Sequence, residues 1–427
     1  MKGLVIRNGR VIDPANDFDA VADVFVADGR IAAIGQAPAG FEVGDELDAA
    51  GLIVCPGLVD LSARLREPGA THKATIASEA RAAVAGGITT LCLPPDTKPA
   101  IDTSSVVELI RRRAEEAGAA RVVPLGALTQ ELGGQLLSGM AALADAGCPA
   151  LSDGGRPVAN SRVLRRAMEY AATFDLPLLL TPKDLALSEG GLMHEGTVAT
   201  RLGLPGIPEA AETAALARDL ALVEQTGART HFARLSTARG ADWLARARRD
   251  GLPVSADVAI HQLFLTEMDL WDFNSTCRVD PPLRGQRDRE ALRRAVAEGV
   301  IEVICSDHQP HDADAKDAPL AGSEPGISGL DSLLALVLRL ADEGVLSLAR
   351  ALALVTSNPA RVLGIDAGHL SPGAPADLCL FDPDAAWWLS ADSMRSRGKN
   401  SPFLGWEFTG QVVHTLVGGR RVYSRGE

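Results

Sequence analysis

The feature that most constrains this chain is a regular alternation of short apolar, β-branched runs with amphipathic helical patterns over most of its 427 residues. Eight apolar runs occur, at 52–60, 88–93, 121–126, 148–152, 176–180, 228–235, 252–258 and 300–306. Helical patterns fill the gaps, for example at 75–85, 104–117, 160–174, 207–226, 238–250, 286–298 and 328–343. Eight strands alternating with helices predict an α/β fold of the (β/α)8 TIM-like barrel type. A doubly wound open sheet is the alternative, but no GxGxxG or GxxxxGK[ST] motif follows the early strands, which disfavours its nucleotide-binding forms.

Both ends of the chain predict a second, β-rich unit. Asn8-Gly9 and Asp28-Gly29 each lie between apolar stretches, which is the strongest short-range signal for a β-hairpin. Near the other end, 378–382 predicts a strand and 412–423 a hairpin. Strands isolated at each end would leave unpaired edges, so we expect both termini to form one small β domain. The predicted domains are therefore 1–54 plus 366–427 for the composite β domain and 55–365 for the barrel.

Charge and composition exclude several classes of partner. The chain has 42 Lys and Arg against 55 Asp and Glu, a formal net charge of −13, so it is a poor candidate for binding nucleic acid or an anionic membrane. It has no run of about 18 apolar residues, and its N-terminus reaches a turn before a signal-like apolar core could form. The six cysteines form no CxxC pair, which indicates neither a disulfide framework nor a Cys-rich zinc site. We therefore expect a cytoplasmic protein.

Polar residues gather where the barrel strands are predicted to end, which is where such barrels carry their chemistry. Several of these segments resemble motifs of the dihydroorotase family of the amidohydrolase superfamily, and the resemblance covers nearly the whole chain. The segments are Pro56-Gly57-Leu58-Val59-Asp60, Leu65-Arg66-Glu67-Pro68-Gly69, Ala85-Gly86-Gly87-Ile88-Thr89-Thr90, Leu202-Gly203-Leu204-Pro205-Gly206-Ile207-Pro208, Pro281-Pro282-Leu283-Arg284, Ser306-Asp307-His308-Gln309-Pro310-His311 and Lys399-Asn400-Ser401-Pro402-Phe403. The resemblance implies a zinc-bearing barrel that interconverts carbamoyl-aspartate and dihydroorotate in pyrimidine biosynthesis.

The positions that would hold the metal do not carry the family's residues. Where the resemblance implies ligand histidines, the chain has Ser62, Arg64, Thr181 and Arg234. Asp153 and Asp307 remain as vestiges of the family's carboxylate ligands. Hydroxyls are weak neutral ligands and Arg cannot ligate, whereas catalytic zinc needs about three protein ligands. A guanidinium ~5 Å from a divalent cation costs roughly 6–7 kcal/mol at an effective dielectric of ~20. We therefore expect no bound zinc or other cofactor and no catalytic residue, with Asp307 paired to Arg64 or Arg234.

The predicted substrate or anion-binding group is Arg64, Arg66, Arg234, Asp96 and Asp280. Arg66 matches the family's substrate-carboxylate arginine. Asp96 and Asp280 stand where the family has Asn, and this change replaces donors with negative charge, which disfavours an anionic substrate. We interpret His231 as a packed strand residue, and His308 and His311 as residues outside any metal site. We interpret Trp387 and Trp388 as side chains that pack at the seam between the two domains.

Three functions compete. The favoured hypothesis is a non-catalytic subunit that resembles the pseudo-dihydroorotases, with the catalytic subunit of aspartate carbamoyltransferase as its partner; we also expect a homo-oligomer. The second is a divergent metal-dependent dihydroorotase or cyclic-amide hydrolase, which would need zinc. The third is a small-anion sensor built on Arg64, Arg66 and Arg234. The first is favoured because the fold alone does not fix a function, and the predicted site has lost its metal ligands.

Overall fold

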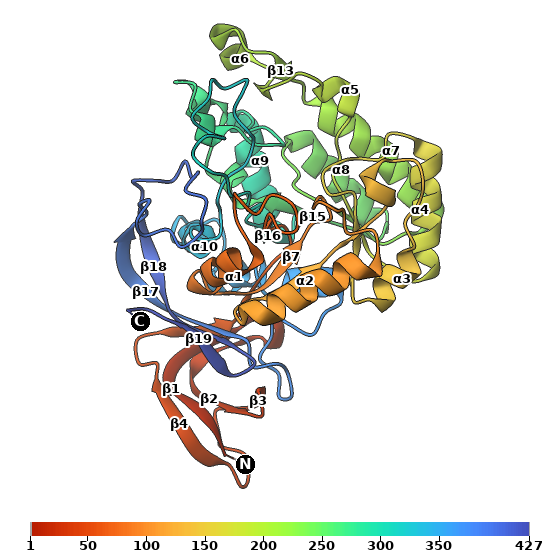
Figure 1. Ribbon diagram of the computed structural model, residues 1–427. Coiled ribbons are helices and arrows are strands. Elements are labelled where there is room, and N and C mark those ends of the chain that lie inside the picture. Colours follow the sequence, from red (N-terminus) through yellow and green to blue (C-terminus); the bar gives the residue numbers. More distant parts are fainter. Residues whose placement is uncertain (1, 427) are drawn as a thin grey trace.

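The computed structural model describes residues 2–426. Figure 1 shows two units, a helix-wrapped barrel formed by the middle of the chain and a twisted sheet formed by its two ends. This arrangement is the predicted fold class, a (β/α)8 barrel with a small β domain built from both termini. No helix within the described residues is long and apolar enough to span a membrane.

The barrel is closed by parallel strands. Its strands are β6 (Leu58–Asp60), β7 (Ile88–Leu93), β8 (Arg121–Pro124) with β9 (Gly126–Ala127), β10 (Leu151–Ser152), β11 (Leu178–Leu180), β14 (Thr230–Phe232), β15 (Val254–Ala259) and β16 (Val303–Cys305). They pair in the order β6-β7-β8 and β9-β10-β11-β14-β15-β16. The last strand returns to the first because Arg64 N donates to His308 O at 2.8 Å and His308 N donates to Ser62 O at 3.0 Å. The residues just beyond β6 and β16 are therefore neighbours at the barrel mouth.

Helices cover the outside of the barrel. The main ones are α1 (Ile76–Ala85), α2 (Ser104–Ala117), α4 (Ser161–Thr173), α7 (Ala210–Thr226), α8 (Ala238–Arg249), α9 (Gln286–Ala297) and α10 (Leu333–Asp342). Each lies within a range that the sequence predicts, because each buries an apolar stripe against the strands. The shorter helices α3 (Met140–Asp145), α5 (Leu185–Ser188), α6 (Thr197–Leu202), α11 (Leu348–Ala353) and α12 (Ser357–Leu363), and the β12 (Met193–His194) and β13 (Gly206–Ile207) pair, were not predicted. They are too short to show a clear period in the sequence.

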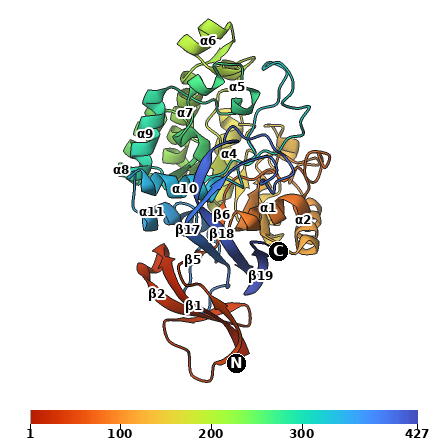
Figure 2. The same ribbon diagram turned by 90° about the vertical axis from the view of Figure 1, so that its left-hand side faces the viewer.

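The terminal sheet joins the two ends of the chain. Its strands are β1 (Lys2–Asp13), β2 (Phe18–Ala27), β3 (Arg30–Ile34), β4 (Glu42–Asp48), β5 (Ile53–Pro56), β17 (Leu378–Trp388), β18 (Glu407–Val417) and β19 (Arg420–Ser424). β5 pairs with β1 on one side and with β17 on the other, so it links the N-terminal and C-terminal strands. Figure 2 shows β17 and β18 continuing past the sheet toward α10. The two units therefore share a packed boundary.

Three local predictions need correction. Asn8-Gly9 is not a hairpin turn, because β1 runs through it with a β-bulge between Ile6 and Gly9. Asp28-Gly29, with both φ angles positive, does form the turn between β2 and β3. The apolar run at 52–60 is two strands, since β5 joins the terminal sheet and β6 begins the barrel. Of the Trp pair, Trp387 is half-buried against the main apolar core of the barrel, whereas Trp388 is exposed, so only the first belongs to the seam.

Candidate functional site

The barrel mouth brings together the residues for which the resemblance implies ligand positions. Ser62 and Arg64 follow β6, Asp153 follows β10, Thr181 follows β11, Arg234 follows β14 and Asp307 follows β16. The parallel strands all end at this edge, which places the six side chains around one centre. All six are buried.

Asp307 is the centre of this cluster. Its Oδ1 lies 3.0 Å from Arg234 Nη1 and 3.2 Å from Arg64 Nη1, and it also accepts from Ser62 Oγ at 3.3 Å. Its Oδ2 accepts from Gln309 Nε2 at 3.3 Å. The predicted pairing of this carboxylate is therefore confirmed, with both arginines rather than one. We call Asp307, Arg64 and Arg234 the mouth ion cluster.

The charges of the cluster fix its protonation state. Burial alone would raise the pKa of Asp307, but the positive charges of Arg234 and Arg64 outweigh burial and hold its pKa below the usual range. Arg234 and Asp307 both adopt positive φ angles, of 59° and 44°, a backbone conformation that non-glycine residues rarely take. Such strain persists where surrounding contacts impose it. A carboxylate that is ionised and saturated with donors is a poor proton acceptor.

Asp153 and Thr181 form a second, adjoining contact. The Asp153 carboxylate accepts from Thr181 N at 2.7 Å and from Thr181 Oγ1 at 3.0 Å. Burial, the largest influence, raises the pKa of Asp153 above its usual value, although these hydrogen bonds act in the opposite direction. The Thr181 hydroxyl also accepts from Arg234 Nη2 at 3.0 Å. The two vestigial carboxylates are therefore both occupied by neighbouring side chains or backbone.

The side chains at the mouth do not fit a divalent metal ion. Two of the four former ligand positions hold guanidinium groups, which have no lone pair to donate, and the other two hold neutral hydroxyls. Of the two carboxylates, Asp307 already has two cations at about 3 Å and Asp153 accepts from Thr181. Among residues 2–426, no group of three or more His, Cys, Asp or Glu side chains is arranged to hold a metal. The mouth ion cluster thus places protein cations where the resemblance implies zinc.

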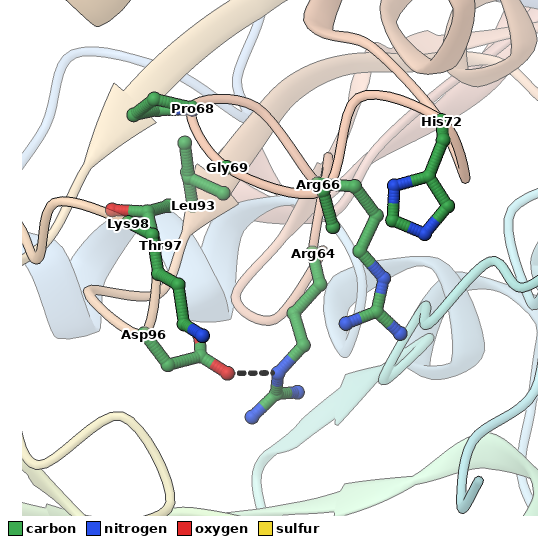
Figure 3. Close-up of a pocket in the computed structure, with 10 residues that line it drawn as sticks. Arg64, Arg66, Pro68, Gly69, His72, Leu93, Asp96, Thr97 and Lys98 are labelled. Atoms are coloured by element: carbon green, nitrogen blue, oxygen red, sulfur yellow. Dashed lines mark hydrogen bonds and ion pairs between the residues drawn. The ribbon is translucent and has the colours of Figure 1, made fainter.

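Arg66 differs from the other two arginines because it has no carboxylate partner among the described residues. Its Nε donates to Pro310 O at 3.0 Å, and its Nη2 lies 3.1 Å from His311 Nε2. Burial, followed by the nearby charge of Arg64, lowers the pKa of Arg66 to about 10. Arg66 lines a cavity of about 250 Å³ that also contains Lys98 and His72. Figure 3 shows the guanidinium groups of Arg64 and Arg66 pointing the same way, with Asp96 joined to Arg64 alone.

The residues of the predicted anion-binding group line two different cavities. Arg64, Arg66 and Asp96 line the cavity of Figure 3, where Asp96 Oδ2 lies 2.6 Å from Arg64 Nε. Arg234 and Asp280 lie instead beside a smaller cavity of about 20 Å³. There Asp280 pairs with Lys183 at 2.6 Å. The five residues therefore do not line one cavity, although Arg64 and Arg234 meet at Asp307.

The side chains of three buried histidines form no hydrogen bond with the mouth ion cluster among the described residues, although His261 lies close enough to feel the charges of Asp307 and Arg234. His231 is packed between strands and contacts Ser255 Oγ at 2.8 Å and Asp257 Oδ2 at 2.9 Å, in agreement with its predicted role. His308 Nε2 contacts Glu79 Oε2 at 2.9 Å. His261 is buried beyond β15 with no hydrogen-bond partner at either ring nitrogen within residues 2–426, and burial lowers its pKa to about 4.

Sequence reasoning gave no role to three residues near the site: Lys183, His261 and Gln309. Gln309 lies inside the motif Ser306–His311 and Lys183 lies two residues after Thr181, and these positions were the one available signal. The partner of Lys183, Asp280, comes from another loop and became visible only in the folded chain, whereas Gln309 donates to Asp307 two residues before it.

Comparison with known proteins identifies the family. A "Dihydroorotase-like protein" of Pseudomonas aeruginosa is 54% identical over 414 residues, covering 97% of this chain and 98% of that protein. The chain belongs to the dihydroorotase family. A "Dihydroorotase" of Anaeromyxobacter dehalogenans (strain 2CP-C) is 44% identical over 426 residues, covering 99% and 98% of the two chains.

Family models and solved structures agree with this dihydroorotase-family assignment. Residues 51–239 match the family model described as Dihydro-orotase-like, and residues 325–423 match the one described as Amidohydrolase family. The L-hydantoinase (dihydropyrimidinase) from Arthrobacter aurescens has a TM-score of 0.88 and 25% identity, with coverage of 100% of this chain and 97% of that one. The dihydropyrimidinase from Brevibacillus agri NCHU1002 has a TM-score of 0.84 at 21% identity, covering 100% and 96%, which supports the fold alone.

Proposed function

We propose that this chain is a non-catalytic dihydroorotase-like subunit of pyrimidine biosynthesis and a structural partner of the catalytic subunit of aspartate carbamoyltransferase. One observation carries the non-catalytic part: Arg64 and Arg234 hold Asp307 at 3.2 and 3.0 Å, in the place that the family resemblance gives to zinc. Hydrolysis of a cyclic amide by a zinc enzyme needs a metal-activated water and a free base. Asp307, neutralised by two guanidinium groups, is neither a free base nor a ligand for such a metal.

The architectural part follows from what the chain keeps. The chain keeps a closed barrel with long mouth loops, although the residues at the ligand positions have changed. We therefore base its role on binding a partner through its outer surface. A protein partner suits the net charge of −13 better than a nucleic acid does. The choice of aspartate carbamoyltransferase rests on the resemblance to subunits that associate with it. Such an assembly needs on the order of 1,000 Å² of buried surface.

The divergent-hydrolase alternative keeps one argument in its favour, since 41–44% identical relatives carry the name dihydroorotase. It requires zinc at the barrel mouth, and the donor set there opposes it.

The proposed function is tested by co-expressing the chain with the transcarbamoylase of the same organism, then measuring assembly size and both activities. We expect one co-eluting complex, and no turnover of dihydroorotate by this chain with or without added zinc. Separate elution at micromolar concentration and low salt would contradict the architectural role. Stoichiometric zinc with turnover that Asp307→Ala abolishes would contradict the non-catalytic one.

A second candidate function is the binding of a small anion, favoured by the unpaired Arg66 in its cavity of about 250 Å³. Of the three predicted sensor arginines, Arg234 does not line this cavity. Calorimetric titration with carbamoyl-aspartate tests this candidate. We expect binding that Arg66→Met removes and that Arg165→Met, an exposed control on α4, leaves unchanged. Equal binding by all three proteins would exclude this site.

A further inference from the structure

The loop after β15 exposes three large apolar side chains within six residues. Met268, Trp271 and Phe273 have exposed fractions of 56%, 42% and 51%. Leu270, between them, is 2% exposed and anchors the segment to the barrel. Single exposed apolar residues are ordinary, whereas a cluster that includes two aromatic rings is typical of a binding surface.

This loop is ordered by its own hydrogen bonds. The short 3-10 helix η4 (Glu267–Leu270) begins at a capping box in which Thr266 N donates to Asp269 Oδ2 at 2.7 Å. A second one, η5 (Ser275–Cys277), follows, and Ser275 Oγ donates to Lys316 O at 2.7 Å. Side chains presented by an ordered loop lose little conformational freedom when they bind.

Phe273 adds an independent observation. Its φ angle is 56°, the left-handed conformation, which is an outlier for a bulky side chain. Local preference does not explain this geometry, and neither does burial, since half of the side chain is exposed. Backbone strain is found where a residue is held for contact with a ligand or partner.

The negative charge of the loop indicates which kind of partner surface it would bind. Between Leu265 and Cys277 the sequence has Glu267, Asp269 and Asp272 but no Lys or Arg. Within residues 2–426, no cation forms an ion pair with Glu267 or Asp272. A two-fold contact between copies would place these carboxylates face to face, which disfavours a second copy of the chain. The complementary surface is an apolar recess with Arg or Lys at its rim.

We infer that this acidic aromatic loop, residues 266–273, is the surface by which the chain binds an apolar, arginine- or lysine-rimmed recess on the catalytic subunit of aspartate carbamoyltransferase. The inference rests on the proposed function. Glu267 lies beside Gly196, the residue before α6. In Figure 1, α6 lies at the opposite end of the molecule from β1–β4, so a partner bound there leaves the terminal sheet uncovered.

The test measures affinity of full-length variants for the same organism's transcarbamoylase catalytic subunit, by biolayer interferometry. Trp271→Ser and Phe273→Ser each weaken binding by about tenfold or more, as expected of central aromatic contacts. Asp272→Lys weakens binding and reduces its dependence on salt. The matched control is Trp388→Ser, which removes an aromatic side chain that is 61% exposed on β17 and leaves affinity unchanged. Thermal unfolding of each variant checks that the fold is intact.

The outcomes separate the loop from the proposed function. If the wild-type chain binds and the loop variants bind equally well, the loop inference is wrong and the partnership stands. If Trp388→Ser weakens binding as much as the loop variants do, the contact is elsewhere or diffuse, which also overturns the inference. If the wild-type chain does not bind, both are wrong. If Trp271→Ser instead dissociates an oligomer of this chain alone, the loop is a contact between copies and the inference fails.

Discussion

Replacement of Asp307 by Asn tests whether the mouth ion cluster stabilises the fold. The carboxylate is 1% exposed, and each arginine contact, at 3.0 and 3.2 Å, is worth a gross Coulomb attraction of about 5 kcal/mol at an effective dielectric of about 20. The cost of desolvating the charges offsets much of that attraction. Asn is nearly isosteric, but it removes the negative charge and turns an amide donor toward guanidinium donors. Since Arg234 then has no carboxylate partner among the described residues and Arg64 keeps Asp96 alone, we expect a loss of about 3–5 kcal/mol in the free energy of unfolding.

The matched control is Asp96→Asn, which removes a carboxylate that also pairs with Arg64, at 2.6 Å, but is 20% exposed in its side chain. Solvent screening reduces the value of that pair, so we expect a loss of about 1 kcal/mol or less. Chemical denaturation followed by circular dichroism gives the unfolding midpoints of both variants. For a chain of this size, the larger loss corresponds to a fall of roughly 3–6 °C in Tm.

The pH dependence provides a further check on Asp307. Because its folded pKa is below the unfolded value of about 3.9, its stabilisation is present above that pH and is lost as the pH falls through the folded pKa. The difference between wild type and Asp307→Asn should therefore be constant from pH 7 to about pH 5 and should shrink below pH 4. A loss no larger than that of Asp96→Asn at pH 7 would refute the view that this carboxylate stabilises the fold in place of a metal site.

Three other changes test the site and its scaffold. The first restores histidine at the four former ligand positions, Ser62, Arg64, Thr181 and Arg234. We expect this variant to gain zinc, measured by mass spectrometry of the metal, yet not to turn over dihydroorotate, because Asp96 and Asp280 still disfavour an anionic substrate. The second, His261→Phe, removes a ring whose pKa is about 4 in the folded chain and about 6.5 in the unfolded chain. The free energy of unfolding of the wild type is therefore up to about 3 kcal/mol higher above pH 6.5 than near pH 4 because of this ring. Tm measured from pH 4.5 to 8 should vary less in the variant, and an unchanged slope would contradict the assignment. The third, Gly410→Ala, places a Cβ against α10 at a φ of 90° and should destabilise by about 1–3 kcal/mol, whereas Gly405→Ala, at 83° with open space, should cost less in the same denaturation assay.

Residue types and periods in the sequence were enough to predict the scaffold. Runs of β-branched residues and helical stripes define the barrel because each element must bury one apolar face, and this requirement is local. The helix at 104–117 was predicted with the bounds that α2 has. The absence of histidine at the four positions where the resemblance implies metal ligands was also readable, because lone pairs and charge are properties of the residue type. Asn8-Gly9 shows the limit of a local pattern, since the same dipeptide serves a turn or a bulge and the neighbouring strand decides which.

Only the tertiary structure decided which charges meet. Asp307 and Arg64 are separated by 243 positions, and nothing local shows whether Arg64 contacts Asp96, Asp307 or both. The same holds for Asp280, which was grouped with the arginines but pairs with Lys183 from another loop. Pair energies depend steeply on distance and burial, and both are fixed by how the strand ends converge. For this reason the sequence identified the cations at the barrel mouth, whereas the folded barrel determined that Arg64 and Arg234 are neutralised and that Arg66 has no acidic partner among the described residues.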